Sequence, residues 1–187
     1  LNVPGEKEFK NKGLTYCATC DGPLFSGKDV AVIGGANSAL DAALQLIKIV
    51  KCIYLINSTS SLGGDAIMRE KVEKNNLVTI LNKAQVTEIV GDKMVTGIRI
   101  KKETGEELLR VQGIFVEIGL IPNSEFGKEL EKNELGEIKV NSRNETNIPG
   151  IFAAGDVTDV AEKQIIIAAG EGSKAALSAF RYLSQNR

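Results

Sequence analysis

The chain has 187 residues, of which 43% are hydrophobic and 25% charged, and its formal net charge at pH 7 is -1. This length suffices for one sizeable core or two smaller ones, and the near-neutral charge favours a small molecule or a protein as partner, with no nucleic acid expected. The chain lacks both a run of about 18 apolar residues and a signal-peptide pattern, so we expect no membrane span, a cytoplasmic protein, and an N-terminus cut from a longer chain.

Strands and helices are predicted to alternate after residue 28. Residues 29–35 form a short apolar run ending in glycines, and residues 37–50 carry apolar side chains at helical spacing. A second strand (52–57), a helix (64–75) and a third strand (77–81) complete a βαβαβ unit. We expect its sheet to be parallel and covered on both faces.

The pattern changes from residue 84 onward. Residues 84–119 contain apolar runs separated by turn signals at 91–92 and 104–105, which predicts a meander of antiparallel hairpins. The first 120 residues therefore predict an α/β fold, a Rossmann-like βαβ nucleotide-binding domain in three layers, with a parallel sheet plus an antiparallel meander.

The remaining residues, 121–187, predict a second segment. Two further strands are expected at residues 136–141 and 150–156, and a long amphipathic helix at about 164–182. The strand at 150–156 should be buried and should end in Gly155-Asp156, which would put a carboxylate at the carboxyl end of a sheet, where ligands of such folds bind.

The turn between the first predicted strand and helix has the pattern of a dinucleotide fingerprint. Gly34 allows a tight turn, Ala39 permits close packing of helix on strand, and the helix N-terminus offers N–H groups to a pyrophosphate. The middle position carries the methyl group of Ala36, where phosphates should approach the backbone. The plainer interpretation is a glycine-rich turn that only closes a βα unit.

The end of the second predicted strand carries neither signature of a nicotinamide nucleotide. An acid there would bind a ribose 2′-hydroxyl and an arginine a 2′-phosphate, but the chain has Asn57-Ser58-Thr59. The nearest arginine, Arg69, lies on the following helix. We therefore expect weak binding of NADH and NADPH with little discrimination.

Two glycines interrupt the predicted C-terminal helix. Gly170 and Gly172 each cost about 1 kcal/mol relative to alanine in a helix interior. Such glycines usually mark close approach by another backbone or by a flat ligand.

The pair Cys17 and Cys20 has CxxC spacing, directly followed by Asp21. A zinc site needs about four ligands, and a chain with three Cys and no His lacks them, so no metal is expected. The spacing is typical of a thiol–disulfide couple. Asp21 could supply the proton donor and acceptor that this couple needs, or it could be an ordinary turn residue. Cys52, in a predicted buried strand, is expected to be a small core residue.

Six stretches of sequence resemble the low-molecular-weight thioredoxin reductase family and are similar, within it, to the flavoprotein component of alkyl hydroperoxide reductase. They run in family order over essentially the whole chain: "NVPGE", "YCATCDGPLF", "VIGGANSALDAAL", "GIFVEIGLIPN", "TNIPGIFAAGDVT" and "QIIIAAGEGSKAALSAF".

The resemblance implies an FAD-dependent protein-disulfide reductase. Residues 1–120 would be a pyridine-nucleotide domain carrying the dithiol, and residues 121–187 the C-terminal part of a split FAD domain whose first half is absent, which makes the chain a fragment. Electrons would pass from NAD(P)H or another reductant through FAD to the dithiol and on to a thioredoxin, a glutaredoxin-like domain or a peroxiredoxin, in a homodimer. Cys20 would face the flavin, Cys17 would attack the partner's disulfide, and Asp21 would be the general acid.

The resemblance also implies cofactor contacts. Asp156 would bind the flavin ribityl chain, and Gln164 with Ile165 would cap the pyrimidine edge of the flavin at a helix N-terminus. In chain order, the candidate cofactor-binding residues are Gly34, Gly35, Ala36, Asn37, Ser38, Asn57, Gly119, Gly155, Asp156, Gln164 and Ile165.

Three departures from the family pattern leave other functions open. Ala36 replaces the usual glycine, no basic cluster follows Ile56, and Glu162 stands where an aromatic residue is common. The alternatives are a nucleotide-binding or regulatory module that kept the fold and lost turnover, a dithiol-only redox protein, and a relative that uses a non-nicotinamide electron donor.

Overall fold

The computed structural model describes residues 1–185 and divides into two units, Leu1–Gly119 and Leu120–Arg187, each of which is described by itself. The helices and strands of the first unit, in chain order, are α1 (Glu6–Phe9), β1 (Leu14–Thr15), α2 (Ala18–Asp21), the 3-10 helix η1 (Gly22–Phe25), β2 (Asp29–Ile33), α3 (Asn37–Leu46), β3 (Cys52–Ile56), α4 (Ala66–Glu73), β4 (Val78–Leu81), β5 (Gln85–Gly91), β6 (Val95–Lys102), β7 (Gly105–Leu109) and β8 (Gly113–Val116). The second unit contains the helix α5 (Ile165–Gln185).

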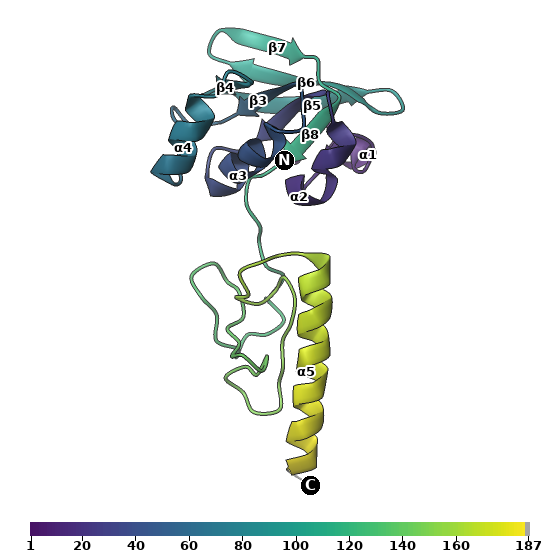
Figure 1. Ribbon diagram of the computed structural model, residues 1–187, viewed down its shortest axis with the longest axis vertical. Helices are drawn as coiled ribbons and strands as arrows, with labels where there is room; N and C mark the ends of the chain where they lie inside the picture. Colours follow the sequence, from purple (N-terminus) through teal and green to yellow (C-terminus); the bar gives the residue numbers. More distant parts are fainter. Residues whose placement is uncertain (186–187) are drawn as a thin grey trace. The chain divides into compact units, whose positions relative to one another are not determined.

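A five-stranded parallel sheet with strand order β1-β8-β2-β3-β4 forms the centre of the first unit (Figure 1). The segment β2–α3–β3–α4–β4 is the βαβαβ unit predicted from the sequence, and its three strands pair in parallel. The strand order reverses between β2 and β8. In open α/β sheets, the carboxyl ends of the strands at such a switch point form the crevice that binds ligands.

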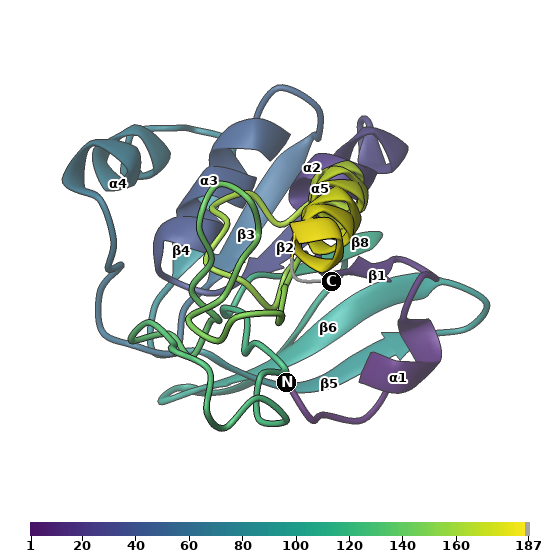
Figure 2. The same cartoon turned by 90° about the horizontal axis from the view of Figure 1, so that it is seen from below.

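The parallel sheet lies between two other layers. Val30 and Val32 of β2 belong to the core under α3, whereas Ala31 and Ile33 belong to the core shared with the antiparallel strands β5 and β6. Figures 1 and 2 show α3 and α4 on one side of the sheet and β5, β6 and β7 on the other. The α/β fold and its three layers, predicted from the sequence, are therefore confirmed.

The prediction that residues 84–119 form one antiparallel meander is wrong for its last strand. Only β5, β6 and β7 pair antiparallel, whereas β8 pairs in parallel with β1 and β2. All four residues of β8 are buried, as is typical of a central parallel strand covered on both faces. A Cβ on Gly113 would lie 2.3 Å from the Phe25 ring, so the first residue of β8 must be glycine for η1 to pack there.

The strands predicted at residues 136–141 and 150–156 are also wrong. The structure has only isolated bridges there, of Ile138 with Lys132 and with Thr158, and of Glu145 with Phe152. A strand needs a ladder of successive hydrogen bonds to a neighbour, but the backbone groups here form only scattered bonds, some within turns and some between segments, such as that of Ile138 N–H with Val157. Residues 151–156 are accordingly half-buried or exposed rather than core.

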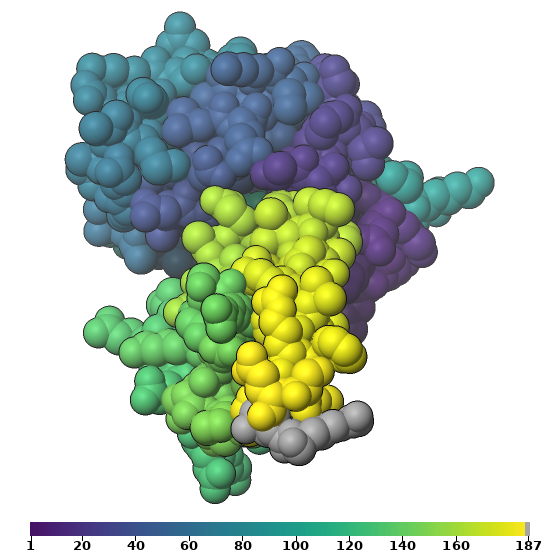
Figure 3. Space-filling model, turned by 60° about the horizontal axis from the view of Figure 1, so that its bottom comes forward, coloured from purple at the N-terminus to yellow at the C-terminus, as the bar shows by residue number. Residues whose placement is uncertain are grey.

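The C-terminal helix predicted at about residues 164–182 is confirmed as α5. Figure 3 shows it on the surface of the second unit, and several of its large apolar side chains are exposed, among them Ile165 and Phe180. A Cβ on Gly170 or Gly172 would meet nothing within 4 Å, so no described residue approaches these glycines closely. No helix within residues 1–185 is both long and apolar enough to cross a bilayer.

We expect the two units to differ in local stability. Amides of β2, β3 and β8 should exchange with solvent at least about 100-fold more slowly than those of residues 120–164. These three strands form a continuous hydrogen-bonded ladder between two apolar layers. Hydrogen exchange followed by mass spectrometry measures this difference directly. Equal protection in the two segments would contradict it.

Candidate functional site

The dithiol turn follows β1 at the carboxyl edge of the parallel sheet. Cys17 and Cys20 are joined by a disulfide with a Cα–Cα distance of 5.3 Å. Cys17 is the N-cap of α2, and its Sγ accepts a hydrogen bond from the backbone N–H of Cys20 at 3.1 Å. Cys20 is exposed and Cys17 is half-buried, so solvent reaches the disulfide mainly from the Cys20 side.

Asp21 is held by the end of β1. The Thr15 hydroxyl donates to the Asp21 carboxylate, and the same hydroxyl oxygen accepts the backbone N–H of Cys17 at 3.3 Å. The carboxylate is half-buried and is linked to the dithiol turn through one side chain.

Glu117, which the sequence analysis did not single out, lies directly after β8 beside the dithiol turn. Its Oε1 accepts the backbone N–H of Ala18 at 3.3 Å. The pKa of Glu117 is raised to about 7, chiefly by burial and also by the charge of Asp41, while the hydrogen bond from Ala18 lowers it. In the sequence, Glu117 is recognisable as an acid that directly follows an apolar run. That pattern points to a place beside the dithiol turn only once β8 is assigned to the parallel sheet.

The glycine turn between β2 and α3 sits next to Glu117. Gly34 has φ +142°, and a Cβ there would lie 2.2 Å from the Glu117 carbonyl oxygen and 2.9 Å from Cβ of Ala39. The predicted roles of Gly34 in a tight turn and of Ala39 in close packing agree with this geometry. Ala36 is the exposed N-cap of α3 and makes no side-chain cap, so the first N–H groups of α3 are open to an anion.

Three other candidate residues surround this turn. Ser38 is exposed in the first turn of α3, whereas Asn37 accepts the backbone N–H of Asp65 at 2.7 Å and so ties α3 to the loop before α4. Asn57 is buried, and a Cβ on Gly35 would clash with its Oδ1 at a distance of 2.2 Å. The Asn57 side chain also bonds the backbone and hydroxyl of Thr59 and the side chain of Asn82, so its polar atoms are already used within the protein.

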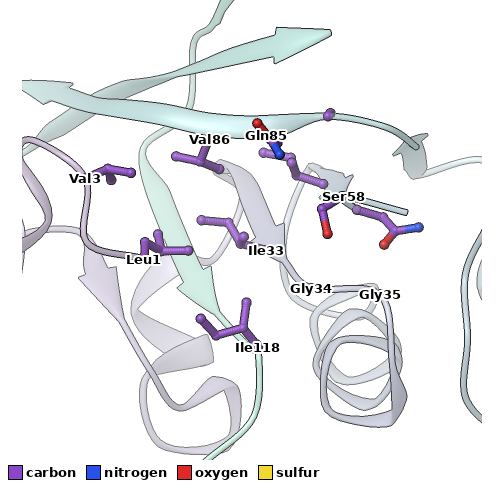
Figure 4. Close-up of a pocket in the computed structure, with 12 residues that line it drawn as sticks. Leu1, Val3, Ile33, Gly34, Gly35, Ser58, Gln85, Val86 and Ile118 are labelled. Carbon is purple, nitrogen blue, oxygen red and sulfur yellow. The ribbon is translucent and has the colours of Figure 1, made fainter. Parts of the chain in front are cut away.

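A pocket of about 250 Å³ opens at these strand ends (Figure 4). Apolar side chains, including Ile33, Val86 and Ile118, line one side, and Gly34, Gly35 and Ser58 lie on the other. The remaining lining residues are Leu1, Val3, Ile56, Asn57, Ala84 and Gln85. An apolar floor with a few polar groups at a switch point is typical of a nucleotide or other small-molecule site.

The candidate residues of the second unit gather around the start of α5. Gly155 adopts φ +80°, and both the N–H and the hydroxyl of Thr158 donate to its carbonyl oxygen. A Cβ on Gly155 would lie 3.5 Å from that of Ala168, so this loop packs on the first turn of α5. Asp156 and Ile165 are exposed there, and Gln164 is half-buried.

Two predicted positions lie apart from these groups. Gly119, the last residue of the first unit, has φ +101° with open space around it. Cys52 is half-buried at the start of β3 rather than in the core, and its thiol donates to Asp29 at 3.2 Å. Burial, together with this hydrogen bond and the charge of Asp29, raises the pKa of Cys52, so this thiol stays protonated. Within residues 1–185, no three His, Cys, Asp or Glu side chains gather as metal ligands.

Residues 1–172 match the family model described as "Pyridine nucleotide-disulphide oxidoreductase". The chain belongs to this family.

Curated relatives and a solved structure support this assignment. The chain is 50% identical over its whole length to a protein called NADH dehydrogenase from Bacillus subtilis and 51% identical to the F component of alkyl hydroperoxide reductase from Staphylococcus aureus. It spans 37% of the length of each. The structure of thioredoxin reductase from Streptococcus pyogenes superimposes with a TM-score of 0.93 at 32% identity, covering 99% of this chain and 62% of that one. The resemblance inferred from the six sequence stretches is thus confirmed.

The raised pKa of Glu117 predicts how the stability of this chain depends on pH. The folded protein holds this proton more tightly than the unfolded chain, so the stabilisation is complete below about pH 4.5 and is lost as pH rises through about 7. Glu117→Gln, which cannot ionise, should therefore gain about 1–3 kcal/mol relative to the wild type between about pH 5 and pH 8.

Urea unfolding at several pH values measures this difference. Glu106→Gln, at an exposed position of β7, is the matched control and should follow the wild type. Parallel pH dependences for Glu117→Gln and the wild type would show that the Glu117 carboxyl has an ordinary affinity for its proton.

Proposed function

We propose that the chain is the dithiol-carrying and nucleotide-binding portion of an FAD-dependent protein-disulfide reductase, of the thioredoxin reductase or peroxiredoxin reductase type. The observation that carries this proposal is a solvent-accessible disulfide placed at the same strand ends as an uncapped glycine turn. Bound flavin supplies the two electrons that reduce such a disulfide. A thioredoxin, a glutaredoxin-like domain or a peroxiredoxin would be the protein substrate of the whole protein, acting as a homodimer.

The residues of the dithiol turn have distinct proposed roles. The N–H of Cys20 points at the Cys17 sulfur and favours its thiolate once the disulfide is reduced, which suits Cys17 for attack on a partner's disulfide. Asp21, held by Thr15, would in its protonated form donate a proton to the departing thiolate.

The cofactor contacts are proposals that the local geometry supports. The Gly34–Gly35 turn and the open N-terminus of α3 leave room for a pyrophosphate, with Ser38 as a further donor. In the second unit, Asp156, Gln164 and Ile165 would contact FAD. Gly170 and Gly172 of α5 would leave room for it, because no described residue lies within 4 Å of where their Cβ atoms would be. Gly119 is kept as a candidate on the resemblance alone.

A trapping experiment separates the roles of the two cysteines. In Cys20→Ser, Cys17 should attack oxidised thioredoxin, and the mixed disulfide should persist because the thiol that would resolve it is gone. We expect at least about tenfold more adduct than with Cys17→Ser, since nucleophilicity follows thiolate character. Non-reducing electrophoresis with peptide mass spectrometry measures both.

The same experiment can contradict the proposal in two ways. Adduct formed mainly through Cys20, the more exposed sulfur, would reverse the assigned roles. Adduct from neither variant would argue against a protein-disulfide substrate of this kind. Cys52→Ser is the matched control and should leave trapping unchanged, because its thiol lies at the opposite end of β3, bonded to Asp29.

The nucleotide site predicts weak binding of both NADH and NADPH, within about tenfold of each other. Asn57 has no polar atom to spare for a ribose, and the Ala36 methyl stands at the cap of α3. A second hollow brings Lys83, Lys101 and Lys102 near Ser58, but Lys83 and Lys102 are paired with Glu103 and Glu107, so a 2′-phosphate would compete with these carboxylates.

Calorimetric titration of each nucleotide into the wild type and Ala36→Gly tests this prediction. We expect the glycine variant to bind both nucleotides several-fold to tenfold more tightly, because the backbone can then approach the pyrophosphate. Low-micromolar binding of NADPH by the wild type, with no gain from the substitution, would show that Ala36 and Asn57 are harmless. Binding of neither nucleotide by either protein would favour a reductant other than a nicotinamide.

A further inference from the structure

Glu117 is a single residue that contacts both halves of the site. Its carboxylate accepts the N–H of Ala18, one residue beyond Cys17, at 3.3 Å. Its main chain bonds Ile33 and lies against Gly34, the first glycine of the nucleotide turn. No role in the proposed function uses this carboxyl group.

We propose that Glu117 holds one proton for the Cys17–Cys20 couple. It takes the proton up when the disulfide is reduced and releases it when the disulfide forms again. This inference rests on the reversible dithiol chemistry proposed above and adds to it the site of one proton.

Dithiothreitol reduces such a disulfide by thiol–disulfide exchange. The S–S bond of the protein breaks, the two thiols of dithiothreitol close into a cyclic disulfide, and two electrons and two protons are transferred in total. Where Glu117 is ionised before reduction, one proton stays on one cysteine as a thiol, the other cysteine becomes a thiolate, and Glu117 takes up the second proton. Oxidation reverses each of these changes.

The charges around Glu117 explain why reduction and protonation are coupled. A new thiolate at the dithiol turn and an ionised carboxylate beside it repel one another, so each raises the pKa of the other. The pKa of Glu117 is about 7, within reach of neutral pH, and burial is the largest cause of this rise. The like charge of Asp41 on α3 adds to this effect, while Asp21 on the dithiol turn is held by Thr15.

Neighbouring elements supply no compensating cation. The flanking residues of β1 and β2, such as Thr15 and Ile33, are uncharged, and Glu117 makes no ion pair with any residue of the described range 1–185. Within the described residues, no side-chain cation neutralises the Glu117 carboxyl group, which leaves protonation as the way in which this chain removes its charge.

The pH profile of thiol alkylation tests the proposal in the full chain. After reduction with dithiothreitol, the rate at which iodoacetamide modifies Cys17 and Cys20 is followed by peptide mass spectrometry between about pH 5.5 and pH 9. The wild type should show an inflection near pH 7 in addition to the step of the thiol itself. Glu117→Gln should show one step and should react up to about tenfold faster above about pH 8, where Glu117 of the wild type is ionised, because an ionised carboxylate raises the pKa of the thiol by about 0.5–1 unit.

The choice of substitution separates proton holding from a structural role. A glutamine amide oxygen can still accept the N–H of Ala18, so a purely structural Glu117 would leave the profile unchanged. Asp41→Asn should move the inflection to lower pH without removing it. Infrared difference spectra of reduction should show the band of a protonated carboxyl in the wild type and lose it in Glu117→Gln.

The possible failures are distinguishable. Superimposable profiles in proteins that each release two thiols on reduction would overturn the role of Glu117 and leave the dithiol chemistry standing. Failure of dithiothreitol to release two thiols from the wild type would overturn the reversible couple, and the inference with it.

Discussion

The parallel pairing of β8 with β1 on one side and β2 on the other is the constraint on which the site depends. The register joins Leu14 to Ile114 and Val32 to Phe115, so the three strands end at the same edge of the sheet. The residues that follow them are the dithiol turn, Glu117 and the glycine turn, which come from distant parts of the sequence. A slip of β8 by one residue would exchange its two faces and carry Glu117 away from both loops.

The apolar layers also explain why the polar chemistry is confined to this edge. Strands buried on both faces leave no room for polar side chains along their length, so these collect where the strands end. Glu117 is the first such residue after β8 and is half-buried. Partial burial raises the free energy of the ionised carboxylate. Titratable groups with raised pKa values often occur at functional sites.

The two units show how much secondary structure depends on partners. Residues 29–33 and 151–154 are both short apolar runs followed by glycine, at Gly34 and Gly155. The first run finds neighbours on both sides and becomes β2, whereas the second makes a single bridge and stays irregular. The large apolar side chains of α5 likewise lack a packing partner in the described chain and are exposed. The chain spans 37% of the length of its curated relatives.

The sequence by itself determined the βαβαβ unit, the glycine turn at Gly34, the helix α5 and the CxxC pair, because each depends on residues close together along the chain: apolar periodicity, a turn glycine, or two cysteines three apart. Only the tertiary structure decided that residues 113–116 join the parallel sheet, that the side chain of Asn57 is committed to its own loop, and that Glu117 lies against the dithiol turn. Strand pairing and burial are set by contacts between segments about 80 to 100 residues apart, as between Ile33 and Glu117 or Ala18 and Glu117. A local pattern carries no information about which of the possible partners a strand will meet, and the environment of a carboxyl group depends on that choice.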